Sequence, residues 1–209
     1  PTEIGGVDET GPYDVVATQG ADPHAPDRST LVSAFHRSGD ICGTCHNLRN
    51  PAFTKDPATG RWEANAMGTP TVDPGAGFPE QSTFDEWQAS TYATTGVATS
   101  QFGGNATTVS TCQDCHMPRV TGKAANLGPI RTDLPLHGFA GANTFVPAIL
   151  PQHPAFGTEV GPLALAAGRL RSIEMLRKAA TVTGTLADGT LTVRVTNETG
   201  HKLPTGYPE

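Results

Sequence analysis

The chain has 209 residues and carries 20 acidic against 14 basic side chains, which gives a net charge of −6 at pH 7. Because it has no basic cluster and only 6% of its residues are aromatic, we do not expect nucleic acid to be a partner. It also contains no run of about 18 apolar residues, so we expect no membrane span.

The first 82 residues are predicted to be mostly irregular, with one short helix. Glycine, proline and aspartate without periodicity indicate an irregular arm over residues 1–28. From Ser29 as a candidate N-cap, apolar residues at helical spacing predict a short helix that stops at Gly39. Proline and glycine return in residues 50–82 and predict a long surface loop there.

A second short helix is predicted to begin at Ser82 or Thr83, with two acidic residues in its first turn. Phe84 and Trp87 fall on one side of this helix, where we expect them to pack rather than react. Residues 94–111 are rich in glycine, threonine and serine and are predicted to be a loop, as is the stretch that follows the second cysteine pair.

The C-terminal part changes from helical to alternating periodicity. Between about Gly161 and Ala180, apolar residues recur at three- and four-residue steps, which predicts an amphipathic packing helix. ADGT at residues 187–190 predicts a turn between two short strands. Because an isolated hairpin is marginal in water and the chain given ends at Glu209, we expect a continuing chain or a neighbouring subunit to complete this β region.

Two five-residue stretches share one pattern and contain every cysteine: CGTCH at residues 42–46 and CQDCH at residues 112–116. Buried free cysteines and disulfide frameworks do not predict two such pentads. Two Cys-x-x-Cys knuckles could form a zinc ribbon, and one such pair could be redox-active. The histidine that ends each pentad favours a third interpretation.

Cys-x-x-Cys-His is the attachment site of c-type haem, in which both sulfurs form thioethers to the porphyrin and the adjacent imidazole binds the iron. The pentads therefore predict two covalent haems, held by Cys42, Cys45, Cys112 and Cys115. Hydrophobic residues make up only 36% of the chain, whereas glycine and proline occupy 24 and 18 positions. Two porphyrins would supply apolar surface that the side chains lack, so we expect folding to depend on haem.

Each haem iron has two axial positions, and His46 and His116 are the predicted proximal ligands. A second histidine gives a closed, electron-carrying iron, a methionine raises the potential, and an open position admits a substrate. Histidines outside the pentads outnumber the two irons, whereas there are only three methionines. These histidines are His24, His36, His137, His153 and His201.

Five stretches carry a family resemblance: FHRSGDICGTCHN, FPEQSTFDEW, CQDCHMP, LPLHGFAGAN and VTNETGHKLPTGYP. Together they resemble exported multihaem c-type cytochromes of the tetrahaem and octahaem group related to hydroxylamine oxidoreductase. The resemblance covers roughly residues 31–50, 78–119, 134–147 and 192–208. Members of that group usually carry four or more pentads and a continuing β domain, so this chain differs in haem count.

The resemblance implies that His36, His137 and His201 are distal ligands, with His24 and His153 as weaker candidates. If all three ligate, at least one serves a haem attached outside these 209 residues. His36 is too close in sequence to cover the haem of its own pentad, so we expect it to serve the haem at Cys112 and Cys115. His46 would then pair with His137 or His201.

The implied fold is a mainly irregular and α-helical multihaem cytochrome c fold, with short helices and long loops around haems and a partial C-terminal β hairpin or sandwich. In this scheme residues 1–157 form the haem-binding region, residues 158–180 the packing helix, and residues 181–209 the start of a β region.

We interpret the chain as an electron-transfer protein with bis-histidine haems rather than an enzyme. Two alternatives stay open: a haem enzyme with one open iron that acts on a small nitrogen or oxygen compound, and a protomer of an extracellular cytochrome filament. Haem attachment outside the cytoplasm implies a periplasmic or extracellular location. Redox proteins are the expected partners, reached through weak, electrostatically steered contacts, together with possible further haem-bearing subunits.

Overall fold

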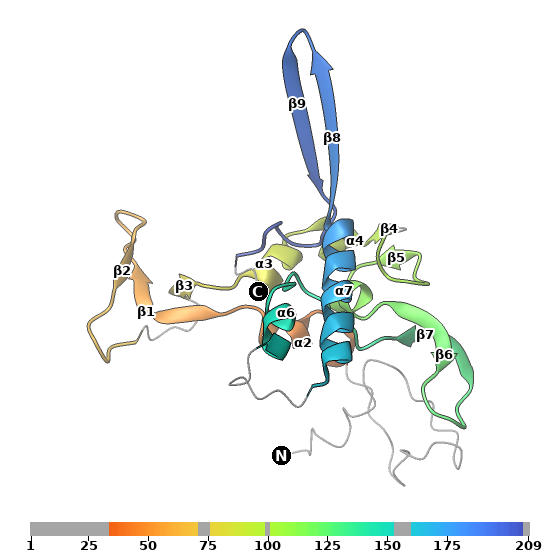
Figure 1. Ribbon diagram of the computed structural model, residues 1–209. Coiled ribbons are helices and arrows are strands. Elements are labelled where there is room, and N and C mark those ends of the chain that lie inside the picture. Colours follow the sequence, from red (N-terminus) through yellow and green to blue (C-terminus); the bar gives the residue numbers. More distant parts are fainter. Residues whose placement is uncertain (1–33, 71–75, 99–100, 153–159, 207–209) are drawn as a thin grey trace. The chain divides into compact units, whose positions relative to one another are not determined.

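The computed structural model describes residues 34–70, 76–98, 101–152 and 160–206 (Figure 1). The chain forms two compact units, each assembled from two separate stretches of sequence. The first unit holds residues 1–42 and 91–140, and the second holds residues 43–90 and 141–209.

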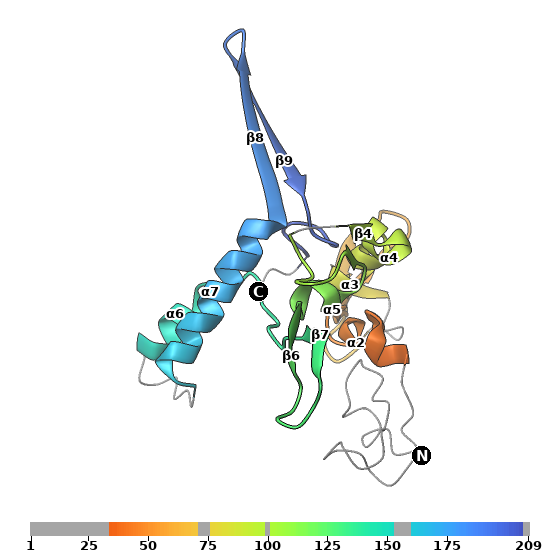
Figure 2. The same cartoon turned by 90° about the vertical axis from the view of Figure 1, so that its right-hand side faces the viewer.

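The first unit is built from short helices and two small antiparallel sheets. In chain order its elements are η1 (Ala34–Arg37), α2 (Asp40–Gly43, which ends at the start of the second unit), α4 (Thr91–Thr95), β4 (Val97–Ala98), β5 (Thr108–Val109), α5 (Cys112–His116), β6 (Arg119–Lys123) and β7 (Ile130–Pro135). β4 pairs with β5, and β6 pairs with β7 in the ribbon visible in Figure 2.

The core of the first unit lies around Val109, which is fully buried, with Phe102 and Met117 each 6% exposed. A tight turn at Gly103 and Gly104 closes this core, because both residues have positive φ angles, which glycine adopts without strain. A side chain at Gly104 would overlap the carbonyl oxygen of Arg119. The turn therefore lies directly against Arg119, the first residue of β6, which follows the second pentad.

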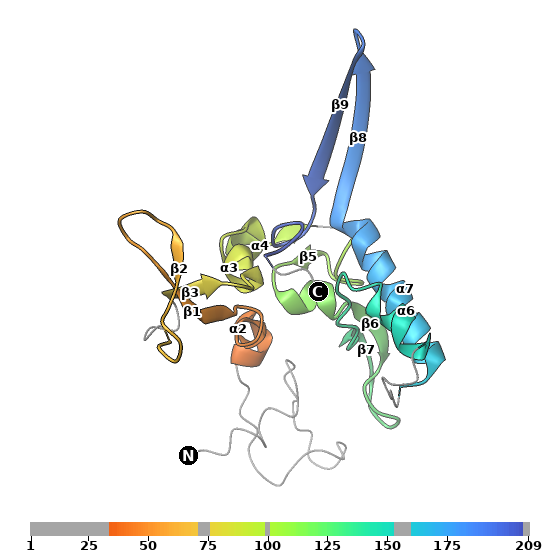
Figure 3. The same ribbon diagram turned by 60° about the vertical axis from the view of Figure 1, so that its left-hand side comes forward.

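The second unit combines a three-stranded sheet, a long helix and a hairpin. Its elements are β1 (Arg49–Lys55), β2 (Trp62–Ala64), β3 (Gly77–Pro79), α3 (Thr83–Gln88), α6 (Val146–Ile149), η3 (Leu150–Gln152), α7 (Pro162–Ala179), β8 (Ala180–Ala187) and β9 (Thr190–Asn197). The antiparallel sheet has the order β2-β1-β3, and its three strands lie close together in Figure 3. The rings of Phe53 and Trp62 pack on Phe78, with centroids 5.9 and 5.3 Å away.

The hairpin of β8 and β9 follows α7 without a break (Figure 1). Its turn uses Asp188 and Gly189, both with positive φ, as a type I′ turn requires. The register pairs Val182 with Val195 and Leu186 with Leu191, so aliphatic side chains share one face and threonines the other. Along this apolar face the aliphatic side chains are 57–74% exposed.

The expectation of a mainly irregular and helical cytochrome fold is wrong. The chain is a mixed α/β protein with several small antiparallel sheets, and 31% of the described residues are helical and 28% are in strands. The predicted loop over residues 50–82 contains β1, β2 and β3, and the loop after the second pentad contains β6 and β7. β1 with β2 and β6 with β7 are hairpins of consecutive strands, and β1 also pairs with the more distant β3. The proline and glycine residues in these segments therefore did not exclude strands.

Other predicted elements are confirmed. The helix predicted between about Gly161 and Ala180 is α7, the turn at residues 187–190 connects β8 and β9, and the helix after Ser82 is α3. The apolar face expected to pack is exposed at Leu163, Leu170 and Leu176, so the structure shows the helix and not its packing. The N-terminal arm and the first part of the predicted helix from Ser29 lie outside the described residues; the remainder of that helix is the short turn η1. Of the helices in the described ranges, none is long and apolar enough to cross a membrane.

Candidate functional site

The second pentad forms the complete helix α5, and the start of this helix is fixed by Thr111, directly before the pentad, together with Asp114 inside it. The Thr111 side chain accepts a hydrogen bond from the Asp114 N–H (3.3 Å), and Asp114 Oδ2 accepts from the Thr111 and Ser110 N–H groups (both 3.0 Å). This capping box satisfies N–H groups that a helix start leaves free. Arg119 Nη2 donates to the other Asp114 oxygen at 2.8 Å, so the guanidinium charge balances the charge of the buried carboxylate.

His116 ends this pentad, and one loop contacts both its Nδ1 atom and its backbone carbonyl. Its Nδ1 donates to the Ala140 carbonyl oxygen at 2.9 Å, and its own carbonyl accepts from the Phe139 N–H at 2.9 Å. A carbonyl can only accept, so Nδ1 carries the ring proton and the lone pair of the neutral imidazole lies on Nε2. Metal-binding histidines commonly have this second interaction. Within this loop the backbone of Phe139 is in the left-handed region, with a φ of 42°.

The first pentad begins in α2 and ends in a turn, where Cys45 and His46 are exposed. Gln81, 4% exposed, places its amide nitrogen 3.3 Å from His46 Nδ1. Rotating this amide by half a turn would offer its oxygen to an Nδ1–H and leave the Nε2 lone pair for a metal. The imidazoles of both pentads thus have Nδ1 engaged.

The four thiols have different environments. Cys42 and Cys112, in the first unit, are hydrogen-bonded to each other, which lowers the pKa of Cys42 to about 7 against the opposing effect of burial. The same hydrogen bond and burial raise the pKa of Cys112. Burial, followed by the charge of Asp114, raises the pKa of Cys115 to about 12. Cys42 is therefore the most acidic of these three thiols.

Two distal candidates lie in the first unit and are placed differently. His36 is half-buried in η1, and Gln113 of the second pentad donates to the carbonyl oxygens of His36 (3.2 Å) and Ser38 (2.6 Å). His137 is exposed and stacks on Phe139, with ring centroids 5.8 Å apart. His137 thus belongs to the loop on the Nδ1 side of His116, whereas η1 is tied to the pentad helix.

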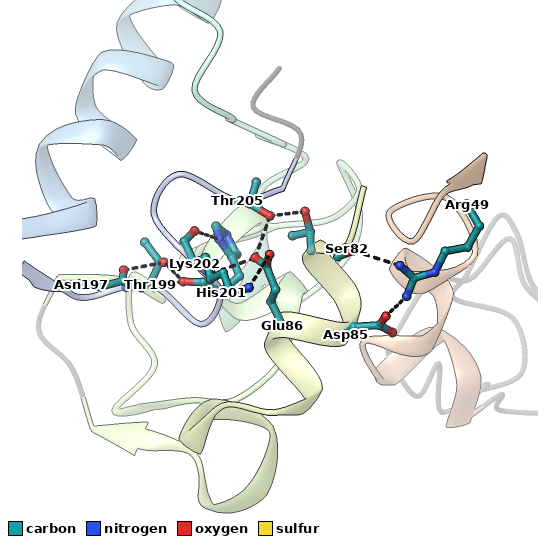
Figure 4. Close-up of polar contacts among 10 residues, drawn as sticks. Arg49, Ser82, Asp85, Glu86, Asn197, Thr199, His201, Lys202 and Thr205 are labelled. Carbon is teal, nitrogen blue, oxygen red and sulfur yellow. Dashed lines mark hydrogen bonds and ion pairs between the residues drawn. The ribbon is translucent and has the colours of Figure 1, made fainter. Parts of the chain in front are cut away.

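His201 lies in the second unit, in the loop that follows β9 (Figure 4). Its Nδ1 donates to the Lys202 carbonyl oxygen at 2.9 Å, so its lone pair also lies on Nε2. Asn197 Nδ2 (2.6 Å) and Thr199 Oγ1 (2.7 Å) donate to its carbonyl oxygen. The end of the hairpin therefore fixes the backbone of this histidine.

His24 and His153 lie outside the described residues. Sequence reasoning missed the residues that hold the pentads and the His201 loop. One signal was present, because Thr111 and Asp114 form the Ser/Thr-x-x-Asp/Glu pattern of a helix start. The others had no local signature. They are Gln81, Glu86, Gln113 and the carbonyl of Ala140.

The residues of the pentads fit haem c, which takes two sulfurs and one imidazole nitrogen from each site. The fit rests on the fixed Nδ1 proton of His116, which leaves Nε2 for iron. Among the described residues, no group of three or more His, Cys, Asp or Glu side chains could hold a metal ion. Comparison of the chain with family models, curated proteins and solved structures finds no match.

Proposed function

We propose that this chain is an electron-transfer protein with a c-type haem covalently attached at each pentad. The observation that carries the proposal is the pair of Cys-x-x-Cys-His pentads, which contain every cysteine and end in imidazoles whose Nδ1 is engaged. Cys42, Cys45, Cys112 and Cys115 would form the thioethers, and His46 and His116 would be the proximal ligands. When bound, each haem supplies a one-electron redox centre.

His36 is the proposed second ligand for the iron at His116. Gln113 lies inside the second pentad and bonds to the backbone at His36 and Ser38, so it fastens η1 to the helix that carries His116. Both histidines belong to the first unit. Because these bonds fix the backbone at His36, less of the chain has to be ordered when iron binds, which favours a closed, six-coordinate centre.

His201 is the proposed second ligand for the iron at His46. Both residues belong to the second unit, and helix α3 bonds to the backbone of His46 and to the His201 loop. His137 is less well placed, because it lies in the first unit, in the loop that engages the Nδ1 side of His116. We therefore assign the two pairs His36 with His116 and His46 with His201, and leave His137 outside them.

With both irons closed by histidine, the protein would pass single electrons and would not bind a substrate at iron. The resemblance to exported multihaem cytochromes and the chemistry of haem attachment support a periplasmic or extracellular location. Redox proteins are the proposed partners.

The test is the intact mass and spectrum of the full chain made in a host that exports the protein and attaches haem. We expect a mass increase of two porphyrins, a Soret band, and ferric paramagnetic resonance signals that are low-spin only. A mass equal to that of the bare polypeptide would reject the proposal. A high-spin ferric signal that responds to cyanide or nitrite would favour an enzyme with an open iron.

A further inference from the structure

We propose that helix α3 is a brace that fixes the distance between His46 and His201, and that Glu86 is the positioning residue that keeps His201 in place. This inference rests on the proposed function, because it concerns the second ligand of the haem at the first pentad. It adds a residue outside the ligand set that decides whether that iron stays closed. Three consecutive residues of α3 carry the argument: Phe84, Asp85 and Glu86.

The first side of the brace holds the end of the first pentad. The Phe84 N–H donates to the His46 carbonyl oxygen at 3.1 Å, which satisfies a backbone donor that the helix start leaves free. Asp85 accepts from Asn47 Nδ2 at 2.9 Å and forms an ion pair with Arg49. The two residues therefore anchor both His46 and the strand that leaves it.

The second side holds the His201 loop, as Figure 4 shows. Glu86 Oε2 accepts from the Lys202 N–H at 3.0 Å and from Thr205 Oγ1 at 2.9 Å. The Thr205 hydroxyl also lies 2.7 Å from that of Thr83. Because Lys202 directly follows His201, the bond from its N–H fixes the peptide that carries the histidine.

The burial of Glu86 makes these bonds strong. Its side chain is only 7% exposed, whereas that of the neighbouring Asp85 is 42% exposed. A buried carboxylate must be satisfied by hydrogen bonds, and bonds to a charged acceptor are about twice as strong as neutral ones. The Lys202 ammonium, 3.8 Å away, adds an opposite charge. The Glu86 carboxylate is thus the charged acceptor among the polar groups that hold this loop.

In this arrangement the Glu86 side chain influences how often His201 stays bound to the iron. If Glu86 no longer accepts these bonds, the loop of His201 is held by Asn197 and Thr199 at its start and by the Thr83 hydroxyl at its end. His201 would then leave the iron more often, and an external ligand could bind in its place. The loss of one charge-assisted hydrogen bond corresponds to a change of at least about tenfold in that opening equilibrium.

The experiment measures cyanide binding to the ferric, haem-loaded full chain. Glu86→Ala should bind cyanide at least tenfold faster than the unchanged protein, and Glu86→Gln, which keeps an acceptor oxygen and the shape, should give a smaller increase. Glu174→Gln is the matched control, because it removes one negative charge from the exposed surface of α7 in the same unit. It should leave the rate unchanged.

A second background separates positioning from general loosening. In His201→Ala the iron should bind cyanide rapidly, and adding Glu86→Gln should change this rate little, because both changes act on the same ligand. Rates that multiply in the double variant would overturn the brace, as would unaltered rates in both Glu86 variants. These results differ from failure of the proposed function itself, which would appear as a chain that carries no porphyrin.

Discussion

Gly43, inside the first pentad, lies directly against the ring of Phe84. A Cβ at Gly43 would be 2.7 Å from two carbons of that ring, closer than atoms in contact allow. The second residue of CGTCH is therefore fixed by packing against α3 and not by haem chemistry, which requires only the cysteines and the histidine.

We predict that Gly43→Ala destabilises the haem-loaded protein by about 1–3 kcal/mol, the range for overpacking a filled site. Denaturant unfolding followed at the Soret band measures the change. Gly141→Ala is the control, because nothing lies within 4 Å of the Cβ it would add. If Gly43→Ala were as stable as Gly141→Ala, the contact with Phe84 would carry no constraint.

The thiols predict a pH-dependent reactivity in the reduced, haem-free chain, measured under conditions in which circular dichroism shows it folded, because these pKa shifts require the folded state. Because the hydrogen bond from Cys112 lowers the pKa of Cys42 to about 7, alkylation of Cys42 should reach half its maximum near pH 7 and level off above about pH 8. Cys115, with its pKa raised to about 12 by burial, should stay slow up to pH 9. Mass spectrometry of iodoacetamide-treated peptides measures both.

Cys112→Ala removes the hydrogen-bond donor and should move the Cys42 midpoint upward, toward its ordinary value. Haem-loaded protein should show no alkylation at any of the four cysteines, because thioether sulfurs do not react in this way. Equal rates at Cys42 and Cys115 across the pH range would contradict the interaction between the two pentads.

We expect Asp114, which lies between the two cysteines of its pentad, to contribute to the free energy of unfolding. Asp114→Ala removes the capping box and leaves Arg119 without its carboxylate, which should cost about 2–3 kcal/mol. Thr111→Ala removes one of these bonds and should cost about 1 kcal/mol. Thermal unfolding compares the two variants, and an equal effect of both would argue against the ion pair.

The proposed ligand pairs give distinct spectra for three histidine variants. His36→Ala and His201→Ala should each turn one of two haems high-spin, because each removes a sixth ligand. His137→Ala should leave both haems low-spin, since its loop lies on the Nδ1 side of His116. Paramagnetic resonance of the ferric proteins tests this, and a high-spin signal in His137→Ala would require a different pairing.

The hairpin should associate through one face only. Leu191 and Thr192 are adjacent in β9 but lie on opposite faces, and Leu191 is 65% exposed. Exposed aliphatic sheet faces promote association, so Leu191→Lys should reduce self-association in sedimentation velocity more than Thr192→Lys. Equal effects would indicate that charge alone, rather than the apolar face, governs solubility.

The sequence predicted those elements whose signal is local. α7 was readable from its apolar spacing and the hairpin turn from Asp188 and Gly189, since both depend on neighbours within a few residues. The three-stranded sheet was not readable, because β1 pairs with β3 across an irregular register and includes Pro51. Short, half-exposed strands of this kind lack the alternation that identifies a buried sheet.

The candidate site shows the same division. The pentads and their histidines could be identified from the sequence. The hydrogen bonds that position them join residues far apart in sequence, such as Gln113 with His36 or Glu86 with Lys202. A backbone acceptor such as the Ala140 carbonyl leaves no trace in residue identity. The pairing of each distal histidine with a pentad therefore depends on contacts that residue identity does not reveal.

The small apolar core has a consequence for calorimetry. In the described residues only Phe102, Val109, Met117 and Ala179 are buried apolar side chains. The heat-capacity increment and the denaturant m-value both grow with the apolar area that unfolding exposes. The polypeptide without haem should therefore melt over a broad temperature range with a shallow denaturant slope, and haem attachment should sharpen both transitions.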